Sequence, residues 1–342
     1  MALENLNLAA ESQQLSLETG LVAVARRDHA QHDAYHRIQP RPMRLGAQAL
    51  APRACHGVRR DFLYPQASDK AWPDLILSHV PFCLSTDGLE LHYDTVGTGP
   101  SLILQTGGAG DGSMWRDAGY LDALSSHYEC VLFDHRGHGR SSQPRQVSAH
   151  RMETYVDDVV ALLDHRAQMR TAFWGYSQGA EVGLALAAMH PERVTALITT
   201  GVVSNPDRRA DKEETLHAMT KLREGGWNAF LDSAEIDQIP SWFQRQIEST
   251  NPEMLALWME AWVGWDPWER LSHVTAPALM FVGEQEDPHD WNSRAGRLMR
   301  DARVVRLLGL DHLAAYIHAD LVLPTAIEFL SRVHGPATVG FK

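Results

Sequence analysis

From about Thr86 onward, short apolar runs rich in β-branched residues alternate with longer segments of helical periodicity. Several apolar runs are continuous rather than alternating, as expected of strands that are buried on both faces. The alternation predicts an α/β protein with a mostly parallel central sheet covered by helices. The predicted strands are 89–96, 102–105, 131–133, 172–176, 194–200, 278–282 and 304–308, and the predicted helices are 153–165, 178–189 and 321–333.

Residues 205–270 break this alternation once, because they are helical in pattern and rich in aromatic residues. We expect them to form a helical cap that interrupts the sheet rather than extending it. Such a density of tryptophan favours an apolar or aromatic pocket, although packing of the cap's own helices would explain most of these residues equally well. Six of the ten tryptophans lie here: Trp227, Trp242, Trp258, Trp262, Trp265 and Trp268.

The N-terminal part of the chain differs from the rest. It is rich in Arg, His, Gln, Ala and Pro and shows no sustained apolar period, so it buries too little surface to offset the entropy of ordering. His29, His32 and His36 would suit a metal only on a helix, and we favour solvated side chains and predict no metal site. The expected division is an irregular extension at 1–86, a core at 87–204 and 271–335, and the cap at 205–270.

Composition narrows the class of protein. The 342 residues include 31 Lys and Arg against 43 Asp and Glu, a formal net charge of -12, which argues against nucleic acid as a partner. Cys55, Cys83 and Cys130 form no C-x-x-C pair, so we expect neither a zinc site nor a disulfide framework. The first residues lack the cationic start of a secretory signal, and no apolar run has the length of a membrane span. We therefore expect a soluble, cytoplasmic protein.

The strongest chemical signal is the pentapeptide Gly175-Tyr176-Ser177-Gln178-Gly179, which joins an apolar strand to a helix rich in small residues. In this setting G-x-S-x-G predicts a serine on a very tight strand-to-helix turn. The glycines relieve crowding at the turn. The helix start aims the backbone N–H of Gln178 at an oxyanion formed on a carbonyl that Ser177 attacks. Ser177 is therefore the candidate nucleophile.

These residues resemble the α/β-hydrolase fold family, in its serine carboxylesterase and lactonase-like branch. The segment DHRGHGRS at residues 134–141 is similar to the family's D-x-R-G-x-G-x-S segment after the fourth strand, which is normally structural rather than catalytic. The resemblance covers about residues 87–334. It implies the α/β-hydrolase fold, a helical cap inserted after the sixth strand, no cofactor, and a triad in the order Ser177, Asp287 and His312.

Each member of this triad has a chemical task. A serine hydroxyl is a poor nucleophile and needs a base within hydrogen-bond reach, which His312 on a loop after the last strand would supply. A carboxylate fixes the tautomer of the imidazole and stabilises the imidazolium. We therefore expect the hydroxyl, the imidazole and the carboxyl group to converge.

The acid is the least settled member. The family commonly places it three residues after the glycine that ends the strand, which here is Gly283. Asp287 stands four residues after that glycine but matches the usual Asp-Pro ending, so we interpret the difference as a one-residue insertion. We favour Asp287 over Glu286, and give Asp290 and Asp311 little weight.

The second oxyanion donor is expected from the glycine-rich loop after the strand at 102–105. Relatives usually have His-Gly there, and Thr106 replaces the histidine, which puts that residue's loop-bracing hydrogen bonds in doubt. Gly107 is kept, and Gly108 falls where the donating N–H belongs. The run fits neither common glycine-rich nucleotide pattern. Substrate contacts are expected from Met114, Trp115 and Tyr176.

Two classes of function follow. The first is a cofactor-free serine hydrolase that cleaves an apolar or aromatic carboxylic ester or lactone through an acyl-enzyme on Ser177. The same groups would also serve a thioester, an amide or a carbon–carbon bond. The second is a ligand-binding or receptor protein of this fold with little turnover, against which an intact triad argues. The sequence predicts neither the substrate's identity nor the oligomeric state.

Overall fold

The computed structural model describes residues 81–201, 203–206, 208–233 and 239–335. Most of the expected N-terminal extension, including the histidine cluster and Cys55, lies outside the described residues. All described residues belong to one unit of the chain, Phe62–Lys342.

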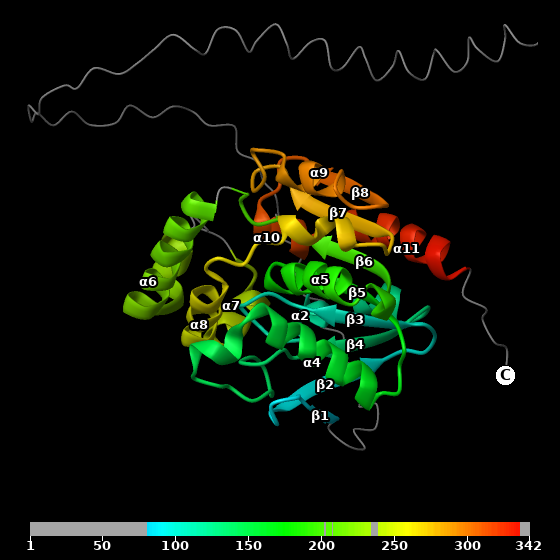
Figure 1. Cartoon of the computed structure of the whole chain (residues 1–342), viewed down its shortest axis with the longest axis horizontal. Helices are drawn as coiled ribbons and strands as arrows, with labels where there is room; N and C mark the ends of the chain where they lie inside the picture. The colour runs from blue at the N-terminus through cyan, green and yellow to red at the C-terminus, as the bar shows by residue number, and fades with distance from the viewer. Residues whose placement is uncertain (1–80, 202, 207, 234–238, 336–342) are drawn as a thin grey trace, which may run out of the picture. The chain divides into compact units, whose positions relative to one another are not determined.

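A central sheet of eight strands runs through this unit in the order β1-β2-β4-β3-β5-β6-β7-β8 (Figure 1). The pairs β1/β2 and β2/β4 are antiparallel and the other five pairs are parallel. The predicted mostly parallel sheet is therefore confirmed. The strands are β1 (Phe82–Leu84), β2 (Glu90–Val96), β3 (Ser101–Gln105), β4 (Glu129–Phe133), β5 (Thr171–Tyr176), β6 (Val194–Thr200), β7 (Ala278–Gly283) and β8 (Ala302–Leu307).

The first strand is the main departure from the expected sheet. β1 lies inside the segment expected to be an irregular extension, so regular structure begins before the boundary at residue 86. Its three residues are too few to show an alternating pattern in the sequence. Pairing with β2 holds it, with Cys83 opposite Leu91 and both side chains buried.

Helices cover both faces of the sheet (Figure 1), and each face carries its own apolar core. One face is covered by α4 (Met152–His165), α5 (Gln178–Met189) and α9 (Trp291–Gly296), and the other by α2 (Met114–Asp117), α3 (Leu121–Leu124), α10 (His312–Ile317) and α11 (Ala319–His334). The predicted helices correspond to α4, α5 and α11. The four short helices carry too few turns for a periodic signal.

Between β6 and β7 the chain passes through the segment that we expected to be a cap. It contains α6 (Arg208–Ser233), α7 (Ser241–Ser249), α8 (Pro252–Trp262) and the 3₁₀ turn η4 (Trp268–His273). α6 is interrupted at Gly226, whose φ of 63° and ψ of -155° are not helical. Arg223 of α6 forms ion pairs with Glu253 and Glu260 of α8, at 3.1 and 2.7 Å. These pairs fasten α6 to α8.

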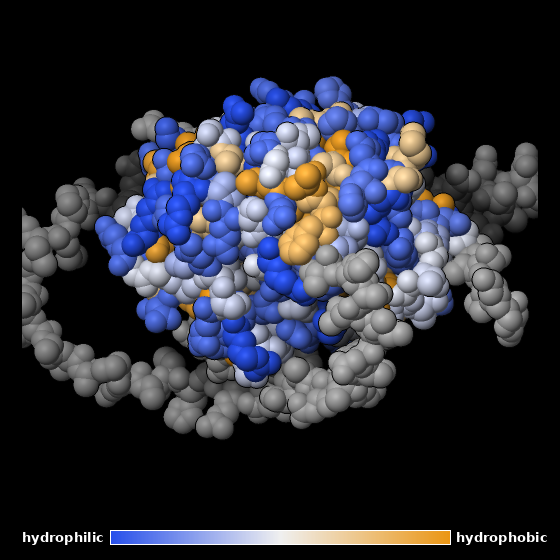
Figure 2. Space-filling model, turned by 90° about the horizontal axis from the view of Figure 1, so that it is seen from below, coloured by the Kyte–Doolittle hydropathy of each residue, from blue (hydrophilic) through white to orange (hydrophobic). Residues whose placement is uncertain are grey.

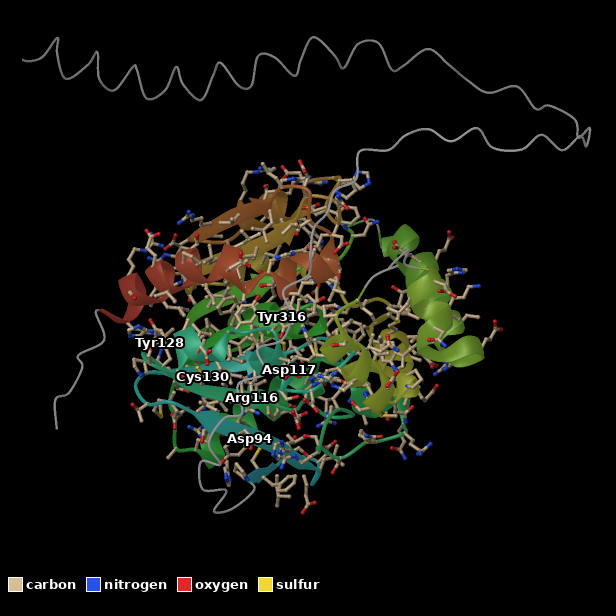
Figure 3. All side chains as sticks on the ribbon, turned by 180° about the vertical axis from the view of Figure 1, so that it is seen from behind. Asp94, Arg116, Asp117, Tyr128, Cys130 and Tyr316 are labelled. Carbon is tan, nitrogen blue, oxygen red and sulfur yellow. The ribbon has the colours of Figure 1, made fainter. Side chains whose placement is uncertain are left out.

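Hydrophilic side chains predominate on the face shown in Figure 2, whereas the described cysteines are buried. This face carries scattered apolar groups, one of them near its centre. The described cysteines, Cys83 and Cys130, are both free and buried. Figure 3 labels Cys130 on β4 together with Tyr316 of α10, which belong to the same apolar core. Within the described ranges, no helix has the length and apolarity needed to cross a membrane.

Candidate active site

Ser177 lies on the sharp turn between β5 and α5. Its backbone has φ 54° and ψ -119°, a positive φ that a residue with a Cβ adopts only where the surrounding structure enforces it. A Cβ on Gly175 would lie 2.1 Å from the carbonyl oxygen of Gly179, so the turn can form only with glycine there. The N–H of Ser177 donates to the carbonyl oxygen of Thr200 at 2.9 Å, which ties the turn to β6.

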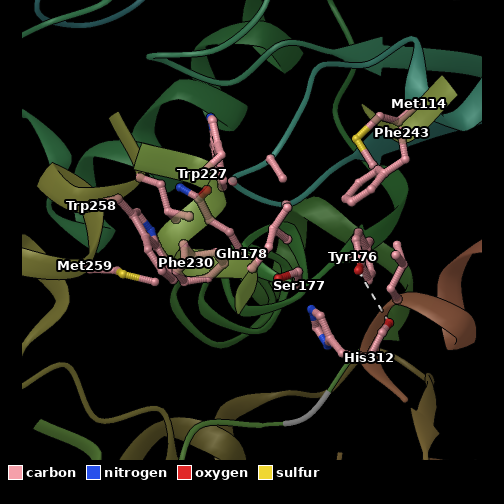
Figure 4. Close-up of a pocket in the computed structure, with 16 residues that line it drawn as sticks. Met114, Tyr176, Ser177, Gln178, Trp227, Phe230, Phe243, Trp258, Met259 and His312 are labelled. Carbon is pink, nitrogen blue, oxygen red and sulfur yellow. Dashed lines mark hydrogen bonds between the residues drawn. The ribbon is translucent and has the colours of Figure 1, made fainter. Parts of the chain in front are cut away.

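His312, the first residue of α10, lies beside Ser177. Both residues line one pocket (Figure 4), and a Cβ placed on Gly201 would be 3.3 Å from His312 Cε1 and 3.5 Å from the Ser177 nitrogen. The ring of Tyr176 stacks on the imidazole with centroids 5.0 Å apart. Its hydroxyl donates to the His312 carbonyl oxygen at 3.4 Å. The serine and the imidazole therefore meet at one cavity, with the ring of Tyr176 stacked on the imidazole.

The carboxylate beside His312 belongs to Glu286, and the expected pairing with Asp287 is wrong. Glu286 Oε2 lies 2.5 Å from His312 Nδ1. A carboxylate only accepts, so Nδ1 carries the hydrogen and Nε2 keeps its lone pair. The other oxygen, Oε1, accepts from the N–H of Gly283 at 2.8 Å. Both oxygens of Glu286 are thus engaged, one by the imidazole and one by the end of β7.

Asp287 is fully buried, and its carboxylate binds the backbone near α9. Its two oxygens accept from the backbone N–H groups of Trp291 and Asn292, at 2.7 and 3.0 Å. Asp287 therefore holds the start of α9. Of the remaining alternatives, Asp290 is exposed, and Asp311 accepts from the N–H of Ala314 at 2.7 Å.

The position of Glu286 was visible in the sequence. It stands three residues after Gly283, which is the spacing that the family commonly uses, so no residue is inserted. Gly283 is required at this point, because a Cβ there would lie 2.5 Å from the Leu310 carbonyl oxygen and 2.7 Å from that of Asp311. This close approach of β7 to the loop before His312 brings the acid and the base together.

Electrostatics around His312 favour its protonated form. Desolvation in the pocket lowers the pKa of His312, but the charge and hydrogen bond of Glu286 raise it, with help from the charge of Asp311. The net pKa is above the ordinary value of 6.5. The imidazole is therefore a somewhat stronger base than a free histidine.

The two expected oxyanion donors lie next to Ser177 and to each other. A Cβ on Gly107 would be 2.7 Å from the Ser177 Cβ, and a Cβ on Gly108 would be 3.1 Å from Gln178 Oε1. Gln178 opens α5, and the first N–H groups of a helix have no partner within the helix. The loop after β3 and the start of α5 thus flank the serine.

The pocket around Ser177 has apolar walls and a cavity volume of about 130 Å³. Among the described residues that line it, none is Asp, Glu, Lys or Arg. Within the described part of the chain, no three His, Cys, Asp or Glu side chains are arranged to hold a metal ion. The larger lining side chains are Met114, Tyr176, Trp227, Phe230, Leu231, Phe243, Leu255, Trp258, Met259 and Leu313 (Figure 4).

Two of the three residues expected to contact the substrate line the pocket. Met114 and Tyr176 line the pocket, but Trp115 does not, and its expected role there is wrong. Trp115 is fully buried and packs edge-on against three core rings, those of Tyr120, Trp174 and Tyr316. Of the six tryptophans expected in the cap, Trp227 and Trp258 line the pocket. The aromatic walls contributed by Phe230 and Phe243 were not anticipated.

The geometry agrees with comparisons to known proteins. Residues 100–260 match the family described as alpha/beta hydrolase fold. The hydrolase YraK of Bacillus subtilis is 36% identical over 115 residues, 34% of this chain and 42% of that protein. The chain thus spans less than half the length of this relative. The 3-oxoadipate enol-lactonase 2 of Acinetobacter baylyi is 27% identical over 226 residues, 61% of this chain and 80% of that protein.

A solved structure extends the likeness over the described sheet. The thermophilic esterase from Thermogutta terrifontis superposes with a TM-score of 0.66 at 22% identity, covering 75% of this chain and all of the esterase chain. Together with the sheet order and the serine turn, these matches show that the described part of the chain has the α/β-hydrolase fold.

Proposed function

We propose that the protein is a serine hydrolase that cleaves a carboxylic ester or lactone through an acyl-enzyme on Ser177. The observation that carries this proposal is the meeting of Ser177 with His312 at one pocket, with Glu286 bound to the far nitrogen of the imidazole. The likeness to an enol-lactonase and to an esterase supports the same reaction class.

In the first half of the reaction, Ser177 Oγ attacks the substrate carbonyl and His312 Nε2 takes the hydroxyl proton. The Nδ1–H of His312 remains hydrogen-bonded to Glu286. This bond keeps the imidazole in the tautomer whose Nε2 accepts a proton, and the carboxylate stabilises the imidazolium. Negative charge develops on the former carbonyl oxygen, and the N–H groups of Gly108 and Gln178 stabilise it. The imidazolium then protonates the departing alcohol, leaving the acyl group on Ser177.

The second half repeats these steps with water. His312 Nε2 takes a proton from water, which attacks the acyl carbon, and the same two amides stabilise the second oxyanion. The imidazolium returns the proton to Ser177 Oγ as the acid product leaves. Apart from the substrate and water, these steps use only side chains and backbone amides of this chain.

The walls of the pocket favour an uncharged substrate. Burial of a carboxylate among Trp227, Phe230 and Leu231 would lack a cationic partner, because the described lining residues include no Lys or Arg. Aromatic and aliphatic groups gain free energy by leaving water for such walls, at about 25 cal/mol per Å². We therefore propose an ester or lactone with apolar or aromatic substituents.

The test is covalent labelling with a fluorophosphonate, followed by hydrolysis of a panel of neutral esters and lactones. We expect labelling of the full chain, its loss in Ser177→Ala, and a fall in kcat of at least about 10⁴-fold in that variant. Ser126→Ala, at an exposed serine, is the matched control and should behave like the unmodified protein.

Two outcomes would contradict the proposal. Labelling that persists in Ser177→Ala would show that a residue other than Ser177 is the nucleophile. A folded protein that binds neutral esters without being labelled or turning them over would favour the ligand-binding alternative.

A further inference from the structure

The loop between β3 and α2 carries Gly108, yet its first residue gives it little support. Thr106 opens the loop, and its hydroxyl reaches the carbonyl oxygen of Gly110 only at 3.4 Å, which is long for a hydrogen bond. Four glycines in the loop add backbone freedom rather than restraint. A donor that must point at one oxygen needs support from outside this loop.

His138, on the segment after β4, contacts the loop directly. Its Nε2 lies 3.0 Å from the carbonyl oxygen of Gly108. A carbonyl oxygen only accepts, so Nε2 carries the hydrogen. The other ring nitrogen, Nδ1, lies 3.3 Å from the carbonyl oxygen of Arg136, which is the longer of the two contacts. Burial lowers the pKa of His138, so the ring is neutral and its single N–H serves Gly108.

A second buried histidine packs against His138. The rings of His135 and His138 lie with centroids 3.9 Å apart, and both are almost completely buried. Burial lowers the pKa of His135, as does His138, while the Gln178 side chain acts in the opposite direction. That side chain is itself buried beside Gly108. His138 therefore contacts Gly108 on one side and packs against the ring of His135 on the other.

The same segment also holds the far end of the loop. Asp134 Oδ1 accepts from the N–H of Gly112 at 2.8 Å. Its Oδ2 accepts from the N–H of Arg140 at 3.0 Å and lies 2.8 Å from His92 Nδ1. The loop is thus held at its beginning by His138 and at its end by Asp134, both of which follow β4, the neighbour of β3 in the sheet.

We infer that His138 is a positioning residue of the oxyanion hole, holding the Gly108 backbone through its hydrogen bond to the Gly108 carbonyl oxygen. This inference rests on the proposed serine hydrolase function. His138 does not line the pocket, so it acts on the substrate only through Gly108. Loss of the His138 N–H would let the loop turn. The Gly108 N–H would then bind the oxyanion less well, and this interaction is strongest in the transition state.

The experiment compares His138→Gln with His138→Met in the full chain. The two side chains have similar length, but only glutamine retains an N–H donor. Removing an oxyanion donor outright costs about 10²- to 10³-fold in kcat, and a misplaced donor should cost less. We expect kcat of His138→Met to be about tenfold below that of His138→Gln, with a similar KM. Affinity for an alkyl boronic acid, which forms a tetrahedral adduct on the serine, should fall by the same factor.

Equal kcat values and equal boronic acid affinities in the two folded variants, with an active unmodified protein, would overturn the inference and leave the proposed function intact. If either variant fails to fold by circular dichroism, the ring tautomer decides instead. Carbon-13 shifts of the His138 ring in the unmodified protein should report hydrogen on Nε2, and hydrogen on Nδ1 would overturn the inference. Absence of Ser177-dependent turnover in the unmodified protein would contradict the proposed function itself.

Discussion

The floor and the walls of the candidate site are built by different interactions. The floor consists of loops at the ends of strands, and directional contacts fix its groups, such as the 2.5 Å contact of Glu286 with His312 and the 3.0 Å contact of His138 with Gly108. The walls are side chains of α6, α7 and α8 that meet the cavity through apolar contacts, among them Trp227 and Phe243.

This difference separates the chemistry from the selectivity. A hydrogen bond weakens steeply with misalignment, so a floor residue tolerates little displacement. Apolar contact has no preferred direction and scales with area, so a wall residue sets the size and polarity of what fits. Changes in the floor should therefore lower kcat for every substrate, and changes in the walls should alter the ranking of substrates.

The largest expected effect in this comparison contrasts Glu286, a carboxylate of the floor, with its neighbour Asp287, which binds the start of α9. Glu286→Gln keeps the shape of the side chain but removes the charge that orients His312, and we expect kcat to fall about 10³- to 10⁴-fold with little change in melting temperature. Asp287→Asn weakens the start of α9 instead. It should cost about 1 kcal/mol of unfolding free energy and leave kcat of the folded fraction within about threefold.

Steady-state kinetics and thermal melting of both variants measure this contrast. A severe loss of kcat in Asp287→Asn with normal turnover in Glu286→Gln would reverse the assignment. Glu286→Asp, which keeps the charge but shortens the reach, should lie between the two.

The pH dependence of turnover is the next effect. Only neutral His312 accepts the serine proton, so kcat/KM should fall as the pH drops through the pKa of His312, with the half-point above 6.5 because Glu286 and Asp311 raise that pKa. In Glu286→Gln the raising charge is gone while desolvation still lowers the pKa, so the half-point should move to lower pH. Profiles of kcat/KM from about pH 5 to about pH 9 measure both half-points. A half-point that does not move in Glu286→Gln would mean that the titrating group is not His312.

The contrast between floor and walls also explains how far the sequence could predict the site. The turn that holds Ser177 is local, because two glycines and the residues between them determine it, and the structure places Ser177 where the pattern indicated. The acid was misassigned because adjacent residues of one turn point in different directions. Spacing from Gly283 pointed to Glu286, whereas the Asp-Pro pair pointed to Asp287, and only the backbone path decides between them.

The walls were less predictable because they depend on how separate helices pack. Trp115 and Met114 are neighbours on α2, yet one enters the aromatic core and the other lines the pocket. Phe230 reaches the cavity because α6 changes direction at Gly226. The hydrophobic periodicity of the sequence predicts neither the change of direction at Gly226 nor the packing of α6 on α8.

The smallest expected effect tests the walls. Phe230→Leu removes part of an aromatic wall that packs edge-on against Trp227 at 5.9 Å, without touching the floor. Hydrophobic pockets discriminate by about 1 to 3 kcal/mol per methylene-sized change. We therefore expect kcat/KM for the bulkiest aromatic ester of a graded panel to change about tenfold relative to the smallest aliphatic ester, in favour of the bulky one. Leu216→Ala, on the same helix but outside the pocket, is the matched control and should leave the ranking unchanged. If Phe230→Leu instead lowered kcat by one common factor for all esters, the wall would be acting on the floor, and the separation of chemistry from selectivity would fail.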